Sequence, residues 1–419
     1  MAANLISEVP IYRKGFGLKQ EVAGELEQDY HCELIDHLQR HDFHLKLPQV
    51  EVFLAREFGF CYGVDRAVDY AYETRKKFPE RRLFLTTEII HNPRVNTRLI
   101  EMGVQFLSGQ YASGVKIGDL KPEDVVLLPA FGVSTHELKA LEKTGCVLVD
   151  TTCGSVANVW RRVERYAREG YTSVVHGKYN HEETIATCSR AESQPGSKYL
   201  VVRDLNEADY VCDFIRHGGD SKEFKSKFEK AASQGFDPNL HLRKIGVANQ
   251  TTMLSSESLE IARRIKVALA DRYGEDDLGN RFLSFDTICS ATQERQDAVI
   301  DMVKNPLDLV LIVGGFNSSN TSHLREISGE KYPAYHIDRL SRIQGSDLIE
   351  HRDPETGDLV QTKDWLPKEF CRIGFTAGAS TPNQVIGEVI QKVLEIKGVD
   401  VLALAQSMTG QPPSRETVE

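Results

Sequence analysis

The chain has 419 residues, of which 41% are hydrophobic and 27% are charged, and its formal net charge is −10 at pH 7. This composition is typical of a globular protein of about two to four domains, and the negative charge argues against a nucleic-acid partner. No apolar run approaches the roughly 20 residues that cross a bilayer, which argues against a membrane role. Residues 1–10 have the features of neither a signal nor a transit peptide, so we expect a cytoplasmic location.

Residues 1–48 are predicted to form an N-terminal extension. Apolar residues recur at helical spacing between Glu21 and Arg40, which predicts one helix. A cluster of possible metal ligands falls here: His31, Cys32, His37, His41 and His44. Histidines on a charged helix are usually solvated, so we favour that interpretation over a metal site.

From residue 50 onward, short apolar strands alternate with helical runs, a pattern typical of parallel α/β structure. One unit, a strand followed by a turn, a cysteine and a helix, occurs three times. Its strands are Phe53–Phe60, Cys146–Val149 and Phe282–Ile288, and its cysteines are Cys61, Cys153 and Cys289. The equivalent placement indicates an internal repeat.

Each cysteine unit is followed by two further strand–loop–helix units. The loops that carry His91, His181 and Ser318 lie 28–30 residues after the cysteine of their own repeat. This agreement depends on no single motif. It predicts an extension at 1–48, α/β repeats at 49–152, 153–288 and 289–400, a surface insertion near 204–243, and a C-terminal tail at 401–419.

The three cysteines predict a metal centre. A helix N-terminus favours the thiolate, which is the form that binds iron–sulfur clusters and zinc. Structural zinc usually has four protein ligands in paired spacing, and the chain has no Cys-x-x-Cys pair. Three cysteines would leave one metal position open to a substrate. The alternative, three buried structural cysteines, is weakened by their equivalent positions.

Polar loops follow the predicted strands of all three repeats. Ligands of parallel sheets bind beyond the carboxyl ends of the strands, and helix N-termini rich in Gly, Ser, Thr and Asn bind anions. Any one of these loops read alone is an ordinary turn or cap, but together they predict a phosphate-binding cradle. No nucleotide-binding P-loop or dinucleotide fingerprint is present.

Eight motifs occur in the order typical of one enzyme family: Gly59–Ala67, Glu88–Asn92, Asp150–Cys153, His181–Thr184, Gln250–Thr252, Ile288–Thr292, Asn317–Asn320 and Thr376–Ser380. Together they resemble the 4-hydroxy-3-methylbut-2-enyl diphosphate reductases, which catalyse the last step of the non-mevalonate isoprenoid pathway. The resemblance runs from about residue 50 to 395. The extension and the insertion resemble the chloroplast and cyanobacterial branch.

The resemblance implies three pseudo-threefold-related α/β domains in a trefoil around a central 4Fe-4S cluster. It implies that Cys61, Cys153 and Cys289 hold the cluster. It also implies that Glu183 delivers protons beside Thr251, and that electrons come from a ferredoxin or flavodoxin. The positions that match the family's diphosphate-binding residues are His91, His181, Ser318, Ser319, Asn320 and Ser380.

One position departs from the pattern, because Phe131 stands where many bacterial members have a histidine that binds the diphosphate. Other loops must then hold the phosphates, and Phe131 could pack on the isoprenoid chain. Two other functions stay open. A non-redox iron–sulfur dehydratase acting on a phosphorylated small molecule would need no reductant, and a non-catalytic phosphate-binding module would contain zinc.

Overall fold

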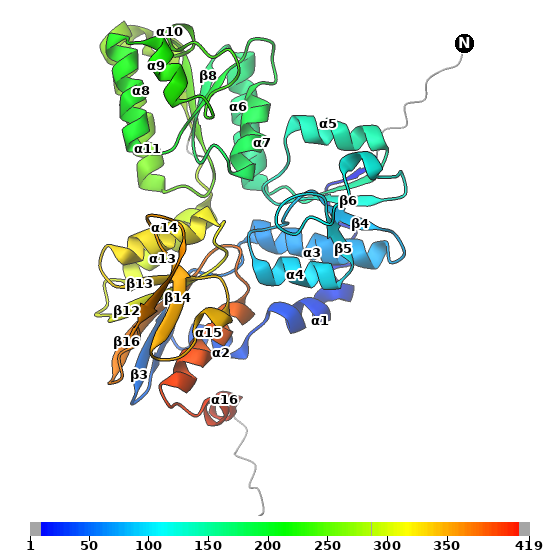
Figure 1. The fold of residues 1–419 in the computed structure, drawn as a ribbon, viewed down its shortest axis with the longest axis vertical. Coiled ribbons are helices and arrows are strands. Elements are labelled where there is room, and N and C mark those ends of the chain that lie inside the picture. Colours follow the sequence, from blue (N-terminus) through cyan, green and yellow to red (C-terminus); the bar gives the residue numbers. More distant parts are fainter. Residues whose placement is uncertain (1–9, 286, 410–419) are drawn as a thin grey trace, which may run out of the picture. The chain divides into compact units, whose positions relative to one another are not determined.

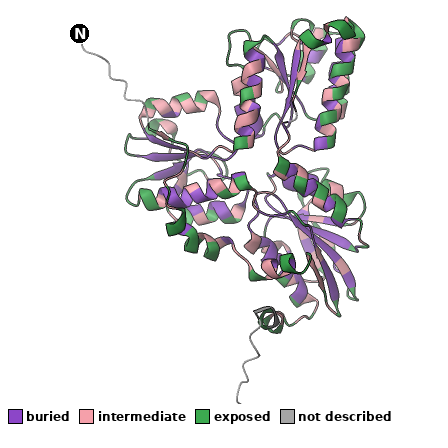
Figure 2. Cartoon of the chain, turned by 180° about the vertical axis from the view of Figure 1, so that it is seen from behind, coloured by how far each residue is buried: buried purple, intermediate pink, exposed green. Residues whose placement is uncertain are grey.

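The structure is a computed structural model that describes residues 10–285 and 287–409. The chain divides into two compact units, which are described separately. The first contains the residues up to Phe16 with Arg66–Ile89 and Ile100–Gln293, and the second contains Gly17–Asp65, Ile90–Leu99 and the residues from Glu294 onward. Buried strands lie between helices in both units (Figure 2). None of the described helices has both the length and the apolar character needed to cross a membrane.

The first sheet lies in the first unit and is entirely parallel, in the order β1-β7-β6-β4-β5. Its strands are β1 (Ile11–Tyr12), β4 (Leu83–Leu85), β5 (Val104–Phe106), β6 (Val125–Leu128) and β7 (Val147–Asp150). Helix α5 (Thr135–Thr144) packs Leu141 against Phe84, Val126 and Leu148 on one face. Cys153 follows the carboxyl end of β7.

The second sheet is also parallel and also lies in the first unit, in the order β11-β10-β8-β9. Its strands are β8 (Thr172–His176), β9 (Tyr199–Val202), β10 (Ile245–Asn249) and β11 (Phe282–Ser284). Neighbouring residues of β8 point to opposite faces: Val174 packs with α8 (Leu205–His217) and α11 (Ser255–Tyr273), whereas Val175 packs with Cys188 of α7 (Glu182–Ala191). Helix α6 (Gly154–Arg168) lies beside α7 (Figure 1).

The third sheet lies in the second unit, in the order β13-β12-β16-β3-β2, with only β2 antiparallel. Its strands are β2 (His44–Lys46), β3 (Val50–Leu54), β12 (Leu309–Val313), β13 (Ala334–Ile337) and β16 (Cys371–Ala377). Leu309, Leu311 and Val313 face α2 (Glu33–Arg40) and α15 (Asn383–Ile396). Val310 and Ile312 face α13 (Ser290–Met302) and α14 (Ser319–Gly329).

The remaining elements are shorter or peripheral. They are α1 (Lys19–Tyr30), α3 (Tyr62–Lys77), α4 (Pro93–Glu101), α9 (Ser221–Lys227), α10 (Pro238–His241), α12 (Leu278–Arg281), α16 (Val401–Thr409), the antiparallel hairpin β14 (Leu348–Arg352) and β15 (Leu359–Lys363), and the 3-10 turns Ile117–Asp119, Glu275–Asp277 and Leu340–Arg342.

The predicted α/β class is confirmed, but several boundaries differ from the predictions. β3 ends at Leu54 rather than Phe60, and it pairs with β16 of the third sheet, although we expected it in the first repeat. The predicted helix Glu21–Arg40 is broken at His31 and Cys32, which have extended backbone. The break lets Ile35 and Leu38 of α2 pack on the third sheet independently of α1.

Two segments are more ordered than their polar composition suggested. The segment 204–243, expected as a surface insertion, contains α8, which buries Val211, Cys212 and Ile215 against the second sheet. Cys212 is therefore a core residue. Residues 401–409 of the predicted tail form α16, and residues 410–419 lie outside the described residues.

Candidate active site

In the first unit, two of the three predicted metal ligands lie near each other. Cys153 is the N-cap of α6, with its amide donating to Ala130 O at 2.8 Å. Ser155, in the first turn of the same helix, donates its hydroxyl to Cys289 Sγ at 3.4 Å. Cys289 therefore lies beside the first turn of the helix that Cys153 caps.

The electrostatics of Cys153 differ from the expectation of a lowered pKa. Burial of the thiol is the largest effect and raises its pKa, as does the nearby Cys289, although hydrogen bonds from the start of α6 act in the opposite direction. Desolvation disfavours the charged thiolate more than the helix N-terminus favours it. A bound metal ion would supply the missing positive charge.

A carboxylate and a hydroxyl form a buried pair at the strand ends of the second sheet. Glu183 is only 2% exposed, in the first turn of α7. One of its carboxylate oxygens accepts from the backbone N–H of Thr251 at 2.6 Å, and the other accepts from Thr251 Oγ1 at 3.0 Å. The carbonyl of Thr251 accepts from the amide of Cys289 at 3.4 Å. Glu183 is therefore linked through Thr251 to the cysteine loop.

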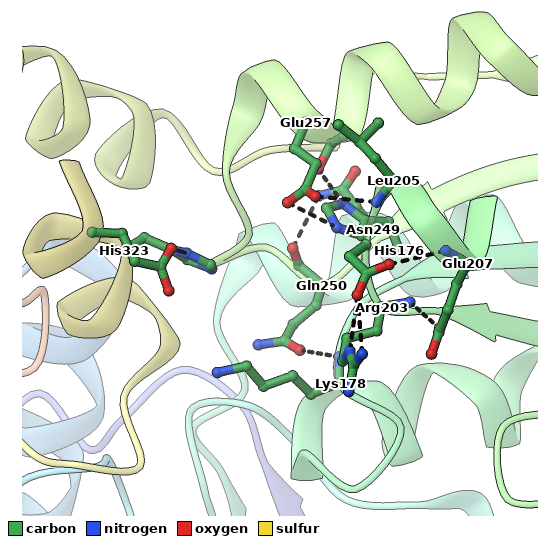
Figure 3. Close-up of polar contacts among 12 residues, drawn as sticks. His176, Lys178, Arg203, Leu205, Glu207, Asn249, Gln250, Glu257 and His323 are labelled. Carbon is green, nitrogen blue, oxygen red and sulfur yellow. Dashed lines mark hydrogen bonds and ion pairs between the residues drawn. The ribbon is translucent and has the colours of Figure 1, made fainter. Parts of the chain in front are cut away.

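Gln250 ties together the loops that carry this pair. Its Oε1 accepts from Lys178 N at 3.1 Å and from Thr184 Oγ1 at 3.0 Å, and its Nε2 donates to Thr252 Oγ1 at 2.8 Å. Figure 3 shows the Gln250 side chain reaching Lys178.

The buried residue His176 is hydrogen-bonded to the loop that carries Gln250. His176 has a 2.7 Å hydrogen bond from Nδ1 to Ser258 Oγ and lies 3.6 Å from Glu257 at Nε2, and its carbonyl accepts from Gln250 N at 2.8 Å. Glu257 lies beside His176 in Figure 3. This support was not predicted, because His176 occupies an ordinary strand position in the sequence.

His181 caps the helix that carries Glu183. Its Nδ1 accepts from Glu183 N at 3.2 Å, and its side chain is largely buried. The ring of Phe131 meets the His181 ring edge to face at 6.3 Å between centroids. Phe131, itself 7% exposed, therefore contacts a predicted diphosphate-binding residue.

In the second unit, Cys61 is positioned by backbone and by a buried arginine. The amide of Cys61 donates to Ala379 O at 3.1 Å. Arg295, 3% exposed, donates to the carbonyls of Gly59 at 2.9 Å and Phe60 at 3.2 Å, just before the cysteine. Sequence reasoning missed Arg295, because nothing in its own helix reveals that it reaches a loop more than 200 residues away.

The predicted phosphate loops of the second unit share direct contacts. Ser380 Oγ donates to His91 O at 3.1 Å, and Asn320 Oδ1 accepts from Ala379 N at 2.9 Å. Ser318 is the N-cap of α14 and accepts from Thr321 N, and Ser319 is the buried first residue of that helix. Within the described residues, the buried Nδ2 of Asn320 has no hydrogen-bond partner. The cradle thus offers a helix N-terminus and an unused donor.

Two glycines permit this close approach of loops. A Cβ at Gly315 would lie 2.1 Å from His91 O, and a Cβ at Gly378 would lie 1.9 Å from Thr321 Oγ1. A side chain at Gly315 would clash with the backbone of the His91 loop, and one at Gly378 would displace the Thr321 side chain. The Gly-rich pattern in these loops is therefore a requirement of packing as well as a feature of anion binding.

The predicted site residues fall into two groups, one in each unit. Cys153, Cys289, His181, Glu183 and Thr251 lie in the first, and the second contains Cys61, His91, Ser318, Ser319, Asn320 and Ser380. Within each group, loops from separate strands meet.

Known proteins resemble this chain over nearly all of its length. A 4-hydroxy-3-methylbut-2-enyl diphosphate reductase from Gloeobacter violaceus is 49% identical over 393 residues, which are 93% of this chain and 93% of that protein. The protein of the same name from Thermosynechococcus vestitus is 48% identical over 398 residues, covering 94% of this chain and 97% of that protein. These relatives are cyanobacterial, as the extension and the insertion predicted.

A solved structure supports the fold. The E-1-hydroxy-2-methyl-but-2-enyl-4-diphosphate reductase from Plasmodium falciparum aligns with a TM-score of 0.59 over 82% of this chain and 88% of that chain, at 22% identity. The family model described as LytB protein matches residues 52–394. This chain therefore belongs to the LytB protein family.

Proposed function

We propose that this chain is a 4-hydroxy-3-methylbut-2-enyl diphosphate reductase. The substrate alcohol accepts two electrons and two protons, its C–O bond breaks, and the products are water with isopentenyl diphosphate or dimethylallyl diphosphate. The observation that carries this proposal is the buried Glu183–Thr251 pair, hydrogen-bonded to the loop of Cys289. Loss of hydroxide needs a proton donor at a water-poor site, and the burial of this pair supports that role for Glu183.

The cysteines fit an iron–sulfur cluster. Among the described residues none of the three candidate ligands forms a disulfide, and Cys153 and Cys289 lie close enough to interact electrostatically. We propose that Cys61, Cys153 and Cys289 hold a 4Fe-4S cluster, with one iron left without a cysteine. Such a cluster would supply electrons and a Lewis-acidic iron for the alcohol.

The polar loops fit a diphosphate. The buried Nδ2 of Asn320 has no partner among the residues that the structure describes, and Ser318 and Ser319 begin α14, whose N-terminus favours negative charge. We assign substrate binding to His91, His181, Ser318, Ser319, Asn320 and Ser380. Binding of the diphosphate would fix the position of the substrate's allylic end, so that the hydroxyl is held in place for the reaction.

Glu183 is assigned to proton delivery, with Thr251 as the hydroxyl between the carboxylate and the substrate. The two hydrogen bonds from Thr251 fix the orientation of the carboxylate, and its burial excludes bulk water. The carboxyl group of Glu183 would give one proton to the leaving hydroxyl and would have to be reprotonated in each turnover, while the second proton of the reaction goes to carbon. Electrons would come from a ferredoxin or flavodoxin.

The test is anaerobic purification, followed by iron and sulfide analysis and an assay on 4-hydroxy-3-methylbut-2-enyl diphosphate. We expect iron and acid-labile sulfide, together with turnover that requires a reductant such as dithionite with methyl viologen. Turnover without any reductant would instead identify a non-redox dehydratase. Zinc in place of iron, with no turnover, would identify a phosphate-binding module.

A further inference from the structure

The solvent-facing side of α6 carries a row of arginines. Their spacing places Arg161, Arg165 and Arg168 on the same face of the helix as its first residue, Gly154. Of these four residues, Gly154, Arg161 and Arg168 are exposed. This face begins directly after Cys153. A Cβ built at Gly154 would meet no atom within 4 Å, so the start of the helix is open to an approaching surface.

Two more arginines of the first unit lie beside the turn that precedes Cys153. Arg66 donates to Thr152 O at 3.1 Å and to Arg13 O at 3.0 Å. Arg13, whose side chain is 68% exposed, lies 3.6 Å from Asp150. We call the arginines of α6 on this helix face, together with the two beside its N-terminus, the α6 basic face: Arg13, Arg66, Arg161, Arg165 and Arg168.

Nearby carboxylates only partly neutralise this surface. Asp150 is opposite Arg13, Glu169 bonds Arg165 at 2.7 Å, and Glu164 is opposite Arg190. Within the described part of the chain, Arg161 and Arg168 take part in no ion pair. The α6 basic face is therefore positive on a chain whose net charge is −10.

The proposed reaction needs two external electrons. The chain carries no dinucleotide-binding fingerprint, so a second protein must bring electrons close to the cysteines. We propose that the α6 basic face is the docking surface for a small acidic electron-transfer protein, which delivers one electron at each of two encounters. This inference rests on the proposed function. Along the helix axis, Arg161 lies about 12 Å from Cys153 at 1.5 Å per residue.

The physical reasons favour this partner over others. Opposite charge steers diffusional encounter and orients the partner, and arginine is enriched at protein interfaces. Arg162 also stacks over Phe285 at 3.9 Å from the ring centroid, which joins α6 to the segment leading to Cys289. An electron-transfer protein bound to this face would therefore contact α6, which begins directly after Cys153 and packs against Phe285, four residues before Cys289.

The test compares two double variants of the cluster-loaded protein. Arg161→Glu with Arg168→Glu reverses two charges on the α6 basic face. Lys222→Glu with Lys225→Glu makes the same change in charge on α9 and serves as the matched control, because both lysines are exposed. Turnover is measured with a reduced acidic plant-type ferredoxin and, separately, with dithionite and methyl viologen. Ferredoxin binding is measured by calorimetry at low and high salt.

The arginine variant should lose roughly 10-fold or more of its ferredoxin-driven kcat/KM and of its ferredoxin affinity at low salt, with a smaller difference at high salt. Its dithionite-driven rate should equal that of the control. Ferredoxin-driven turnover and binding equal to the control would overturn the proposal. A parallel loss of both rates would also overturn it, since the arginines would then act on the reaction itself.

Failure of the proposed function gives a different result. Unaltered protein would then show no turnover with dithionite, and the calorimetric comparison alone would decide the docking surface. Binding of a single-stranded oligonucleotide in preference to ferredoxin would contradict the choice of partner.

Discussion

At the scale of single residues, the burial and hydrogen bonds of Glu183 are the clearest indication of a role in the reaction. An acid in the first turn of a helix is favoured by the helix dipole, which is worth about 0.3–1 kcal/mol. That effect needs no burial, yet Glu183 is 2% exposed and both of its oxygens accept from Thr251. Burial of a carboxylate costs free energy, so a structural role alone explains the residue poorly.

Replacing Glu183 with Gln separates the two roles. Glutamine keeps the size and the acceptor for Thr251 N–H but cannot deliver a proton. We expect turnover to fall by about 10²-fold or more, with the iron content and substrate affinity retained. Glu137→Gln, in the first turn of α5, is the control for the dipole effect and should keep its turnover. Near-normal turnover of a cluster-loaded Glu183→Gln protein would remove Glu183 from the mechanism.

The sequence motifs single out candidate site residues, but they do not reveal the residues that position them. Glu183, Thr251 and the cysteines fall in motifs at strand ends, where topology alone predicts function. Arg295 and His176 do not, because their roles arise from contacts with distant loops. The position of Cys153 at a helix N-terminus predicts a lowered pKa, but burial of the thiol raises it. The sequence around the cysteine does not reveal that burial.

At the scale of elements, the alternation of apolar strands and helices predicted the α/β class, because burial on both faces gives parallel strands a continuous apolar sequence. Partner choice was harder to predict. β3 lies early in the chain but pairs with β16, more than 300 residues later, and no local pattern specifies such a partner. Helix α8 was likewise not predicted in the polar segment 204–243, because its buried residues are spaced between charged ones.

One element contact predicts a pH effect on stability. His336 of β13 bonds Gly314 O at 2.9 Å at the end of β12. Burial lowers the pKa of His336 to about 4, and Arg352 and Arg325 act in the same direction, whereas the Gly314 bond and Asp338 oppose them. Between pH 6.5 and about 4 the unfolded imidazole therefore binds a proton that the folded one does not, so stability falls as the pH falls through this range.

The size of this effect is on the order of 3 kcal/mol once the pH is below both pKa values. His336→Gln can keep a donor to Gly314 without titrating, so its free energy of unfolding should change less between pH 6.5 and 4. Urea unfolding at several pH values, followed for the transition of the second unit, measures the difference. The same loss of stability in the variant and the parent would exclude His336 as the cause.

At the scale of the whole molecule, the candidate ligands come from both units, with Cys61 in the second and Cys153 and Cys289 in the first. A cluster held by all three would make iron content a property of the complete chain. We therefore expect Cys61→Ser, Cys153→Ser and Cys289→Ser each to lower iron and sulfide sharply and to abolish turnover, although the substitutions lie in different units.

Cys32→Ser is the matched control, because Cys32 is partly exposed like the three candidate ligands and is the N-cap of α2, away from the three cysteine turns in sequence. This variant should keep its iron, sulfide and activity. Measurement is by metal and sulfide analysis of anaerobically purified protein, together with circular dichroism to establish that each variant is folded. Full iron content and activity in Cys153→Ser would disprove the three-cysteine centre. Loss of iron in Cys32→Ser as well would mean that iron retention reports general stability rather than ligation.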